Sequence, residues 1–367
     1  MNKRSVIHNK SYYFIYPGDI NTKTGGYIYE KNILKRAKKI KFNLNTLKLA
    51  DSFPFPKEND LKNLKKTLDK LPDNAVLIFD GLVFECIDSI INYLDRFVVI
   101  ALIHHPLYLE FNGNQSQFFL KNAKKLYKKT KKIIVTSNDT KQLIFEKFKI
   151  NKRKIQVVEP GIEKLKKYKY KRDKNINLLS VGSIIERKNY HYLLNELRYM
   201  DKIKLNIVGD ITRESKYYNR LLKIISNYRL SNKVKFHSNV STNLLSKLYS
   251  KCDFYVSVSK YEGFGMSLAN ALQLKKMIIT YKTKTIMSTL KKDGIIYLNN
   301  FKEKSLSKLV TKNAFNSDLS KKLSQNKRKF LTPIQSGDLF IKIIKDCLLY
   351  TSPSPRDAIP SRMPSSA

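Results

Sequence analysis

The stretch FYVSVSKYEGFGMSLANALQL, residues 254–274, decides the fold. Its first part, Phe254–Val258, is a short apolar run that predicts a buried strand. Its last part, which begins near Met266, predicts a helix. A strand that leads through a short glycine-containing loop into a helix is typical of parallel α/β sheets, whose ligands bind at the carboxyl ends of the strands.

The loop within this stretch carries residues suited to a ligand. Gly263 and Gly265 let the backbone approach a bound molecule closely, because they have no Cβ. The free N–H groups at the start of the following helix favour an anion such as a phosphate. Glu262 offers a carboxylate that can accept hydrogen bonds from hydroxyl groups. We therefore expect Glu262, Gly263, Phe264 and Gly265 to line a ligand site.

Strands and helices alternate on both sides of this stretch. The strands expected in the first half are 12–16, 75–79, 97–103, 132–136 and 155–158, with a helix over 27–37. The second half has expected strands at 177–181, 204–208, 233–236, 254–258, 277–280 and 295–298, and expected helices at 190–200, 217–228, 242–250 and 266–274. Two such runs predict an α/β protein of two Rossmann-like domains whose parallel sheets face each other across a cleft.

A charged stretch without periodicity separates the two runs. Residues 163–175 predict a linker, so we expect one domain over 1–162 and a second over 176–346. The end of the chain differs in composition: four of the eleven prolines lie in 351–367, and no lysine does. We interpret residues 347–367 as a non-native or disordered tail and leave them out of the fold.

The first half contains two further loops that follow predicted strands. Gly25 and Gly26 come directly before a predicted helix, where bare backbone and free N–H groups suit an anion. His104 and His105, two of only five histidines, meet at the end of the strand 97–103. A histidine there can hydrogen-bond a ligand hydroxyl or help to position an acceptor. The alternative is that both are satisfied structural residues.

In the second half, residues 182–189 follow the strand 177–181 and lead into a helix. Arg187 and Lys188 lie where a phosphate would dock. Two fixed cations beside a diphosphate stabilise the charge that grows on it as it leaves. In a lysine-rich chain one such pair is weak evidence, but four loops in this order are much stronger.

The order and spacing of these loops resemble glycosyltransferase family 4, whose members have the GT-B fold. The resemblance spans about residues 12–300. It includes Thr24–Tyr27, the His-Pro segment at 104–106, Thr136-Ser137, Pro160–Ile162, Val181-Gly182, Arg187–Asn189, Ile207–Gly209 and Glu262–Gly265. The last of these motifs is the most specific.

The resemblance implies a retaining glycosyltransferase that takes a sugar from a nucleotide-diphosphate donor, without a cofactor or a metal ion. No Asp-x-Asp pair occurs in the chain. The acceptor would be a glycan or a lipid-linked molecule in the synthesis of a cell-surface polysaccharide or lipopolysaccharide. Glu262 would contact the donor sugar, and His104 or His105, with His104 preferred, would lie near the reacting centre. The implied donor-phosphate residues are Gly25, Gly26, Arg187, Lys188, Gly263, Phe264 and Gly265.

Two positions depart from the family's pattern. Where the family has a second Glu that accepts hydrogen bonds from the donor ribose, this chain has Asn270. Asn can still accept through one carbonyl oxygen, so the loss of charge is expected to cost about 1 kcal/mol. Ser183 occupies a position where many members have an Arg. Both departures weaken the expected donor site without removing it.

The net charge of +41 has three interpretations. They are nucleic-acid binding, attraction to an anionic membrane surface, and a simple consequence of base composition, since Lys, Asn, Ile and Tyr are all abundant. The densest lysine cluster, residues 121–132, could be a basic amphipathic helix on a membrane or an ordinary surface helix whose apolar stripe faces its own sheet. Because the charge is spread along the chain and no aromatic-basic signature occurs, we expect no nucleic-acid partner.

Other features of the sequence narrow the cellular context. No apolar run is long enough for a membrane span or a signal peptide, so we expect a cytoplasmic protein that can bind peripherally to the inner face of the membrane. Cys86 and Cys252 lie in apolar runs and are expected to be core residues. The alternatives to an active transferase are a GT-B protein that binds a ligand or partner without turnover and, as a minor rival, a phosphorylase of the same fold.

Overall fold

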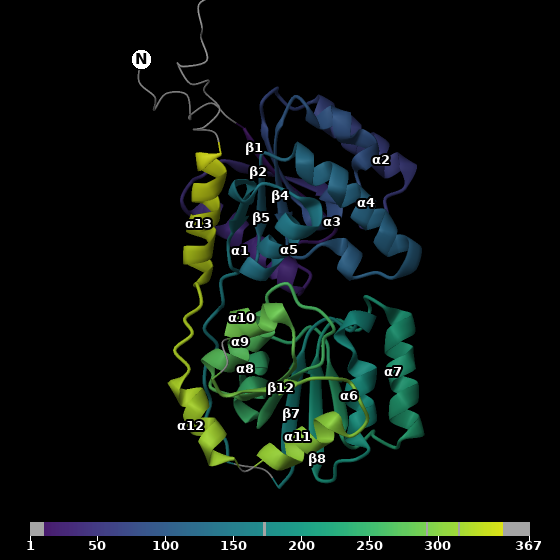
Figure 1. The fold of residues 1–367 in the computed structure, drawn as a ribbon, viewed down its shortest axis with the longest axis vertical. Coiled ribbons are helices and arrows are strands. Elements are labelled where there is room, and N and C mark those ends of the chain that lie inside the picture. The colour runs from purple at the N-terminus through teal and green to yellow at the C-terminus, as the bar shows by residue number, and fades with distance from the viewer. Residues whose placement is uncertain (1–10, 172–173, 291–292, 315, 348–367) are drawn as a thin grey trace, which may run out of the picture.

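The computed structural model describes residues 11–171, 174–290, 293–314 and 316–347. Two α/β domains lie end to end, with the first in purple to teal and the second in teal to green (Figure 1). The interpretation of residues 348–367 as a tail falls outside the described residues. Cys347, where we expected that tail to begin, is buried at the end of the last described helix.

The first domain is built on a six-stranded parallel sheet of order β2-β1-β3-β4-β5-β6. Its strands are β1 (Tyr12–Pro17), β2 (Leu44–Leu49), β3 (Val76–Asp80), β4 (Val98–Ile103), β5 (Lys132–Val135) and β6 (Ile155–Val157). Its helices are α1 (Gly25–Lys39), α2 (Glu58–Asp69), α3 (Gly81–Phe84), α4 (Gly113–Lys129) and α5 (Asn138–Phe148), with 3-10 turns η1 (Asp88–Leu94), η2 (Leu107–Leu109) and η3 (Lys152–Lys154).

The central strands of this sheet are buried on both faces. Every residue of β3 is buried, because alternate side chains enter two different cores. Leu77 and Phe79 pack into the larger core, which also contains buried residues of α2, α4 and α5. Val76 and Ile78 pack into the other core. The continuous apolar runs that predicted these strands are explained by this double burial.

The second domain repeats the design with a parallel sheet of order β12-β11-β10-β7-β8-β9. Its strands are β7 (Ile176–Val181), β8 (Ile203–Val208), β9 (Val234–His237), β10 (Phe254–Ser257), β11 (Met277–Tyr281) and β12 (Ile295–Leu298). Between and after them come η4 (Glu186–Lys188), α6 (Tyr190–Leu197), α7 (Ser215–Asn227), α8 (Thr242–Lys251), α9 (Met266–Gln273), α10 (Lys284–Leu290), α11 (Ser305–Asn313) and α12 (Ser317–Gln325). This is the doubly wound Rossmann order, with the strand order reversing between β7 and β10.

The last described helix, α13 (Pro333–Asp346), corrects the expected domain boundaries. The sequence predicts that the chain through residue 346 belongs to the second domain, but α13 runs beside the first domain in Figure 1 and packs against α1. Its buried residues Phe340 and Ile344 complete the core around β1 and β3. The chain therefore crosses between the domains twice, at residues 158–175 and again before Pro333.

Side-chain contacts hold the two crossings together. The Arg328 guanidinium donates to both carboxylate oxygens of Glu159, at 2.7 and 2.6 Å. Ser336 donates to the Glu159 carbonyl, and the Ile162 N–H donates to the Leu331 carbonyl. Because Glu159 precedes the linker and Arg328 precedes α13, these contacts fasten the outgoing and returning chains to each other near the domain junction.

Candidate active site

The carboxyl ends of β7 and β10 bring the predicted cations and the predicted acid together. Lys188 Nζ lies 2.5 Å from Glu262 Oε1, and both side chains are largely buried. Arg187 donates to the Tyr261 carbonyl at 2.5 Å, and its Nη1 lies 3.9 Å from Glu262 Oε2. The three residues converge at the point where the strand order reverses, which is where doubly wound sheets bind their ligands.

The electrostatics of this group follow from burial and pairing. Burial lowers the pKa of Lys188, while Glu262 opposes that shift. Burial by itself would raise the pKa of Glu262, but Lys188 and Arg187 hold it below its ordinary value. At neutral pH Glu262 is therefore an anion between two cations. The two cations are possible partners for a diphosphate, with the Glu262 carboxylate between them.

A carboxylate from the opposite domain also faces Arg187. Glu110 Oε1, just after η2, lies 3.2 Å from Arg187 Nε and 2.7 Å from His105 Nε2. Neither His105 Nε2 nor Arg187 Nε has a hydrogen-bond partner among the described residues, so the attraction is mainly coulombic. Burial would raise the pKa of Glu110, but His105 and Arg187 together hold it well below the usual range. Glu110 of the first domain thus partly neutralises Arg187, one of the two residues predicted to bind phosphate.

The predicted glycines lie where backbones meet across the cleft. A Cβ on Gly263 would be 2.2 Å from the His104 carbonyl oxygen, so the close approach of the domains requires glycine there. A Cβ on Gly25 would be 3.7 Å from Met266 Sδ, at the start of α9. Gly25 and Gly26 open α1, after the Thr24 hydroxyl that accepts from the Tyr27 N–H. The two predicted glycine loops therefore face each other.

Gly265 is needed for the backbone conformation at the start of α9. Its φ of +89° lies in the left-handed region, where it precedes the first turn of α9. Phe264 turns its ring inward, into a small core with Ile162 and Ala269. Its side chain cannot contact a phosphate, so any contribution of Phe264 to the donor site comes from its backbone.

Asn270 is partly exposed on α9, and its Oδ1 is buried and has no hydrogen-bond partner in the described part of the chain. An orphaned buried acceptor needs a donor, and a ribose hydroxyl would supply one. Ser183, the second departure from the family pattern, is buried.

His104 joins the two halves of the cleft. Its carbonyl accepts a hydrogen bond from the Thr136 hydroxyl at 2.8 Å, and the same hydroxyl lies 3.2 Å from the Gly263 carbonyl. Its ring packs against Gly26, where a Cβ would be 3.2 Å from the ring. His105 is turned toward Glu110 and the Tyr261 ring, whose centroid is 5.6 Å away. The two histidines thus differ in role: His104 touches both glycine loops, and His105 supports Glu110.

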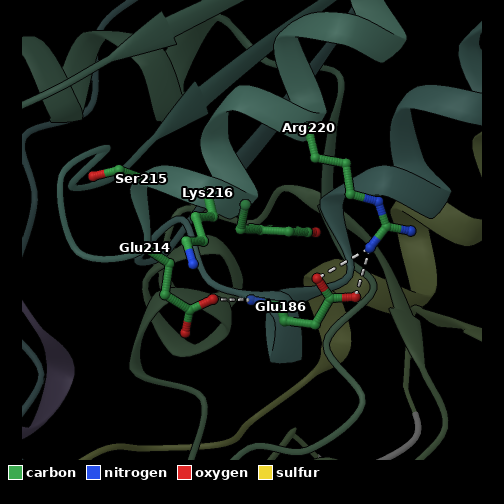
Figure 2. Close-up of a pocket in the computed structure, with 6 residues that line it drawn as sticks. Glu186, Glu214, Ser215, Lys216 and Arg220 are labelled. Atoms are coloured by element: carbon green, nitrogen blue, oxygen red, sulfur yellow. Dashed lines mark hydrogen bonds and ion pairs between the residues drawn. The ribbon is translucent and has the colours of Figure 1, made fainter.

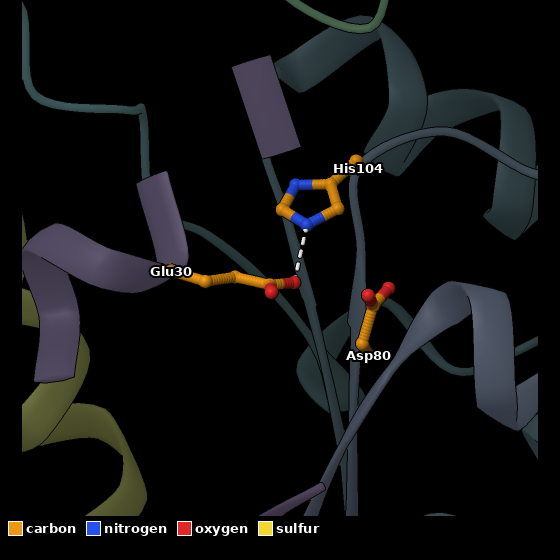
Figure 3. A group of neighbouring side chains, drawn as sticks. All are labelled: Glu30, Asp80 and His104. Carbon is orange, nitrogen blue, oxygen red and sulfur yellow. Dashed lines mark hydrogen bonds and ion pairs between the residues drawn. The ribbon is translucent and has the colours of Figure 1, made fainter. Parts of the chain in front are cut away.

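Behind His104 lie two carboxyls that the sequence analysis did not select. Figure 3 shows Glu30 from α1 and Asp80 from the end of β3 converging on the imidazole, with Glu30 Oε1 at 2.8 Å from His104 Nε2. Ligand atoms of the three residues all lie within 4.8 Å of one another, so the cluster is the one place in the described chain that gathers three potential metal ligands. Glu30 and Asp80 are buried.

The sequence contains signals that could have identified Glu30 and Asp80. Glu30 shares the inward face of α1 with Ile33 and Ala37, which is unusual for an acid. Asp80 directly follows four buried apolar residues at a strand end, the same pattern that selected His104. Glu110 had no comparable signal, because only the folding of η2 brings it to Arg187.

A separate pocket of about 480 Å³ lies between Glu186 of η4 and residues 214–220 at the start of α7 (Figure 2). It is lined by Glu186, Glu214, Ser215, Lys216, Tyr217 and Arg220. Glu214 accepts from the Glu186 N–H, and Arg220 pairs with the Glu186 carboxylate at 3.1 Å. All six lining residues belong to the second domain, whereas the group around Arg187 and Lys188 also meets Glu110 of the first domain, so that group is the better candidate site.

The two parallel six-stranded sheets and their strand orders fit a GT-B fold. Solved structures agree. Sucrose-phosphate synthase from Thermosynechococcus elongatus has a TM-score of 0.73 at 15% identity, with 92% of this chain and all of that chain (100%) covered. Anabaena HepE in complex with UDP and glucose has a TM-score of 0.69 at 12% identity, covering 92% of this chain and 99% of that one. At such identities these matches establish the fold.

Sequence comparison adds the class of protein. Residues 161–330 match the family of glycosyl transferases, group 1. The chain is 28% identical over 201 residues to the O-antigen chain mannosyltransferase RfbU of Salmonella typhimurium, and the match covers 54% of this chain. The matched stretch spans about half of that relative, 56% of its length. These matches support the glycosyltransferase class that the sequence motifs predicted.

Proposed function

We propose that this protein is a retaining glycosyltransferase of family 4, which transfers a sugar from a nucleotide-diphosphate donor to a glycan or lipid-linked acceptor. The observation that carries the proposal is the Lys188–Glu262 pair with Arg187, at the strand-order reversal and opposite Gly25, Gly26 and His104. The printed function of the RfbU relative, O-antigen chain mannosyl transfer, supports a role in cell-surface polysaccharide or lipopolysaccharide synthesis.

In the proposed reaction, the cationic residues of the cleft would bind the diphosphate, and its oxygen acceptors would bind hydroxyl groups. Arg187 and Lys188 would bind the diphosphate and stabilise the charge that develops on it as the sugar leaves. Glu262 would accept from donor-sugar hydroxyls, and Asn270 from the ribose. As the resemblance to family 4 implies, the departing phosphate would help to deprotonate the acceptor hydroxyl. The reaction as proposed needs neither a cofactor nor a metal ion.

A donor panel tests the proposal directly. The purified chain is incubated with UDP-, GDP-, ADP- and dTDP-sugars, with and without a crude membrane fraction as acceptor, and products are read by mass spectrometry. Transfer or hydrolysis of one donor is expected, and Glu262→Ala should reduce it by about 100-fold. An inactive wild type, or a Glu262→Ala variant at wild-type rate, would contradict the proposal.

A second candidate is a GT-B protein that binds its ligand without turnover. Asn270 and Ser183 favour it, because both replace charged groups of the family pattern with neutral ones. Tight binding of a nucleotide diphosphate in calorimetry, with no turnover of any donor in the panel, would select this candidate over the enzyme.

We also propose that the acceptor is met at an anionic membrane surface. Among the described residues, no helix combines the length and apolar character needed to cross a bilayer. In α4, the apolar stripe of Phe119, Ala123, Leu126 and Tyr127 packs inward on the domain's own core, while the lysines at 121, 124, 125, 128 and 129 are exposed. A membrane would therefore be met by lysines, with the exposed Phe118 beside them.

Vesicle sedimentation tests this surface. Binding to phosphatidylglycerol vesicles, but not to phosphatidylcholine vesicles, is expected at low salt, and changing Lys121, Lys124 and Lys128 to Glu should weaken it. The matched control changes Lys216, Lys223 and Lys235, three exposed lysines of the second domain, to Glu. Equal loss of binding in both triple variants would show that net charge, and not α4, governs the attraction.

A further inference from the structure

Four phenylalanine rings of the first domain, Phe55, Phe111, Phe118 and Phe119, form an aromatic cluster that reaches the surface. The rings of Phe111 and Phe119 stack with centroids 5.0 Å apart, and the Phe55 ring packs edge-on against both, at 5.2 and 5.6 Å. Phe118 packs edge-on against Phe119 at 5.2 Å. Phe119 is fully buried, whereas Phe55 and Phe118 are 45% and 46% exposed and Phe111 is half-buried. Contiguous exposed apolar surface of this kind marks a contact with a ligand or partner, unlike apolar residues scattered singly.

The backbone around Phe55 is fixed, although its ring is largely exposed. Pro54 and Pro56 flank the residue and restrict the backbone. The Phe55 N–H donates to the Ser52 carbonyl at 2.7 Å, and the neighbouring Phe53 is buried in the larger core of the domain. The exposure of Phe55 therefore does not come from a loose loop, because the turn holds the ring at the surface.

The aromatic cluster lies at the carboxyl edge of the first sheet, the edge that also carries Gly25 and His104. Phe55 follows β2, and Phe111 follows β4 and η2. Their rings meet although β1 and β3 separate these two strands in the sheet. The helices α2 and α4 pack into the same core and lie on the same side of the domain in Figure 1. Ligands of parallel sheets bind at this edge.

The aromatic cluster begins beside the candidate donor site. Phe111 directly follows Glu110, whose Oε1 lies 3.2 Å from Arg187 Nε. The Ser116 hydroxyl donates to the Tyr108 carbonyl at 2.8 Å, which ties the first turn of α4 to η2. Helix α4 also packs against η2. The rings and Glu110 are therefore held close together on the side of the cleft that the first domain forms.

The surface around the aromatic cluster is cationic. Residues 111–138 contain seven lysines and no Asp or Glu. Lys121 follows Phe118 by three positions, which places it on the same face of α4 as that ring. Lys121 and Lys124 are exposed, and neither forms an ion pair with any residue that the structure describes. Unpaired lysines beside exposed apolar rings are complementary to a ligand that has an anionic group next to an apolar chain.

The charge and the position of the aromatic cluster favour one occupant. A second copy of this chain docked through the same surface would bring the lysines of both copies together, and like charges repel. A flat membrane surface would meet α4 along its whole exposed side, whereas the aromatic cluster is small and begins next to Glu110. This placement favours a molecule that is bound in the cleft and whose apolar chain leaves the cleft over the rings.

We propose that the exposed rings of the aromatic cluster bind the apolar chain of a lipid-phosphate acceptor, with Lys121 and Lys124 beside its phosphate. This inference rests on the proposed function for the reaction and selects the lipid-linked class from the acceptors that the function allows. The part of the acceptor that receives the sugar lies on the cleft side of the rings, toward Glu110. A soluble glycan leaves the rings in water and gains nothing from them.

Fluorescence tests the proposal directly, because the chain contains no tryptophan. The variant Phe118→Trp has a single indole, which lies in the aromatic cluster. Farnesyl phosphate, added below its critical micelle concentration, should shift the indole emission to shorter wavelength and saturate the change. Inorganic phosphate should cause no shift, and isopentenyl phosphate, with a much shorter chain, should bind at least about tenfold more weakly because it buries less apolar surface. No shift with farnesyl phosphate, or equal affinity for the two prenyl phosphates, would overturn the proposal.

Two further variants locate the binding. Adding Phe55→Ser to Phe118→Trp removes one exposed ring and should weaken the binding of farnesyl phosphate by about tenfold. The matched control adds Ile40→Ser, which removes a comparably exposed apolar side chain at the end of α1 and should keep the Kd. Leu222→Trp places the indole on an exposed site of α7 in the second domain and should show no shift. An unchanged Kd in the Phe55→Ser variant, or an equal shift in Leu222→Trp, would count against the aromatic cluster.

Two other outcomes would assign the aromatic cluster to another occupant and overturn the proposal. Phosphatidylglycerol vesicles that shift the indole emission of Phe118→Trp, when soluble farnesyl phosphate does not, would identify the membrane surface. An emission that changes on dilution without any ligand, together with a dimer in sedimentation velocity, would identify a second copy of this chain.

Kinetics separate this inference from the proposed function. With an active donor, the double variant Phe55→Ser and Phe118→Ser should raise the apparent KM for the acceptor in the membrane fraction by at least about tenfold. The double variant Ile40→Ser and Leu222→Ser should keep the wild-type KM. An unchanged KM in the first double variant would refute this inference alone. Saturable binding of farnesyl phosphate by a protein that turns over no donor would refute the proposed function alone.

Discussion

The two domains stabilise their buried ionisable groups in opposite ways, and we call their facing surfaces the two walls of the cleft. In the second domain, Lys188 and Glu262 are both ionised and stabilise each other at 2.5 Å. In the described part of the first domain, no Lys or Arg forms an ion pair with Glu30 or Asp80, and burial favours their neutral forms. One wall is therefore set up to hold an anion through charge, and the other to hold hydroxyl groups through neutral hydrogen bonds. A nucleotide sugar, with a charged diphosphate and an uncharged sugar, presents those two halves.

The largest expected effect comes from the charged wall. Lys188→Ala should reduce transfer by roughly 100-fold or more, because it removes a cation from the leaving diphosphate and leaves Glu262 buried without its main partner. Steady-state kinetics with the identified donor measure the effect. Lys223→Ala, an exposed lysine of α7, is the control and should keep wild-type rates. Near-normal turnover in Lys188→Ala would show that the charge of Lys188 is not needed for transfer, and the comparison between the two walls would fail.

A smaller effect, a gain in ligand affinity, is expected where Glu110 of the first domain faces Arg187 of the second. Glu110→Gln removes the carboxylate that faces Arg187 at 3.2 Å and should tighten the binding of a free nucleotide diphosphate by about tenfold. Isothermal titration calorimetry at low ionic strength measures this change. Asp88→Asn, which removes a carboxylate of the same domain that pairs with Lys125, should leave the affinity unchanged. Weaker binding in Glu110→Gln would mean that Glu110 orients Arg187 and does not compete with the ligand.

Asn270→Glu should strengthen donor binding more modestly. A carboxylate restores the charge-assisted hydrogen bond to the ribose, which corresponds to an affinity gain of about fivefold at roughly 1 kcal/mol. Titration with a nucleoside diphosphate and with its 2′,3′-dideoxy analogue gives the comparison. The gain should disappear for the analogue, and an equal gain for both ligands would exclude the ribose contact.

The smallest effect concerns stability. Because the pKa of Glu85 is raised to about 8 in the folded protein, the folded state binds more protons than the unfolded state between about pH 4.5 and pH 8. The stabilising contribution is complete below the unfolded pKa and is lost as the pH rises through the folded one. Glu85→Gln should therefore flatten the pH dependence of the unfolding free energy in this window, measured by urea titration. An unchanged slope would show that Glu85 is ionised in the fold.

Much of the architecture was readable because the central strands are buried on both faces. The runs at 75–79 and 97–103 gave strands that differ from β3 and β4 by one residue at their ends. The edge strand β2 was not predicted, because its residues are mostly exposed or half-buried and lack a continuous apolar run. The helix α13 was assigned to the wrong domain, since nothing local in Pro333–Asp346 states which core its apolar face will enter.

For the site, the sequence determined what belongs to a single strand-loop-helix unit. Gly25, Gly26, Arg187, Lys188 and Glu262–Gly265 all lie at the ends of predicted strands, and the fold brings them to one cleft. The pairing of Glu110 with Arg187, and of Glu30 and Asp80 with His104, joins residues separated by 24 to 77 positions. Hydrophobic periodicity specifies which face of an element is buried, but the partner that a buried polar group meets depends on how elements pack, and only the tertiary structure decides that.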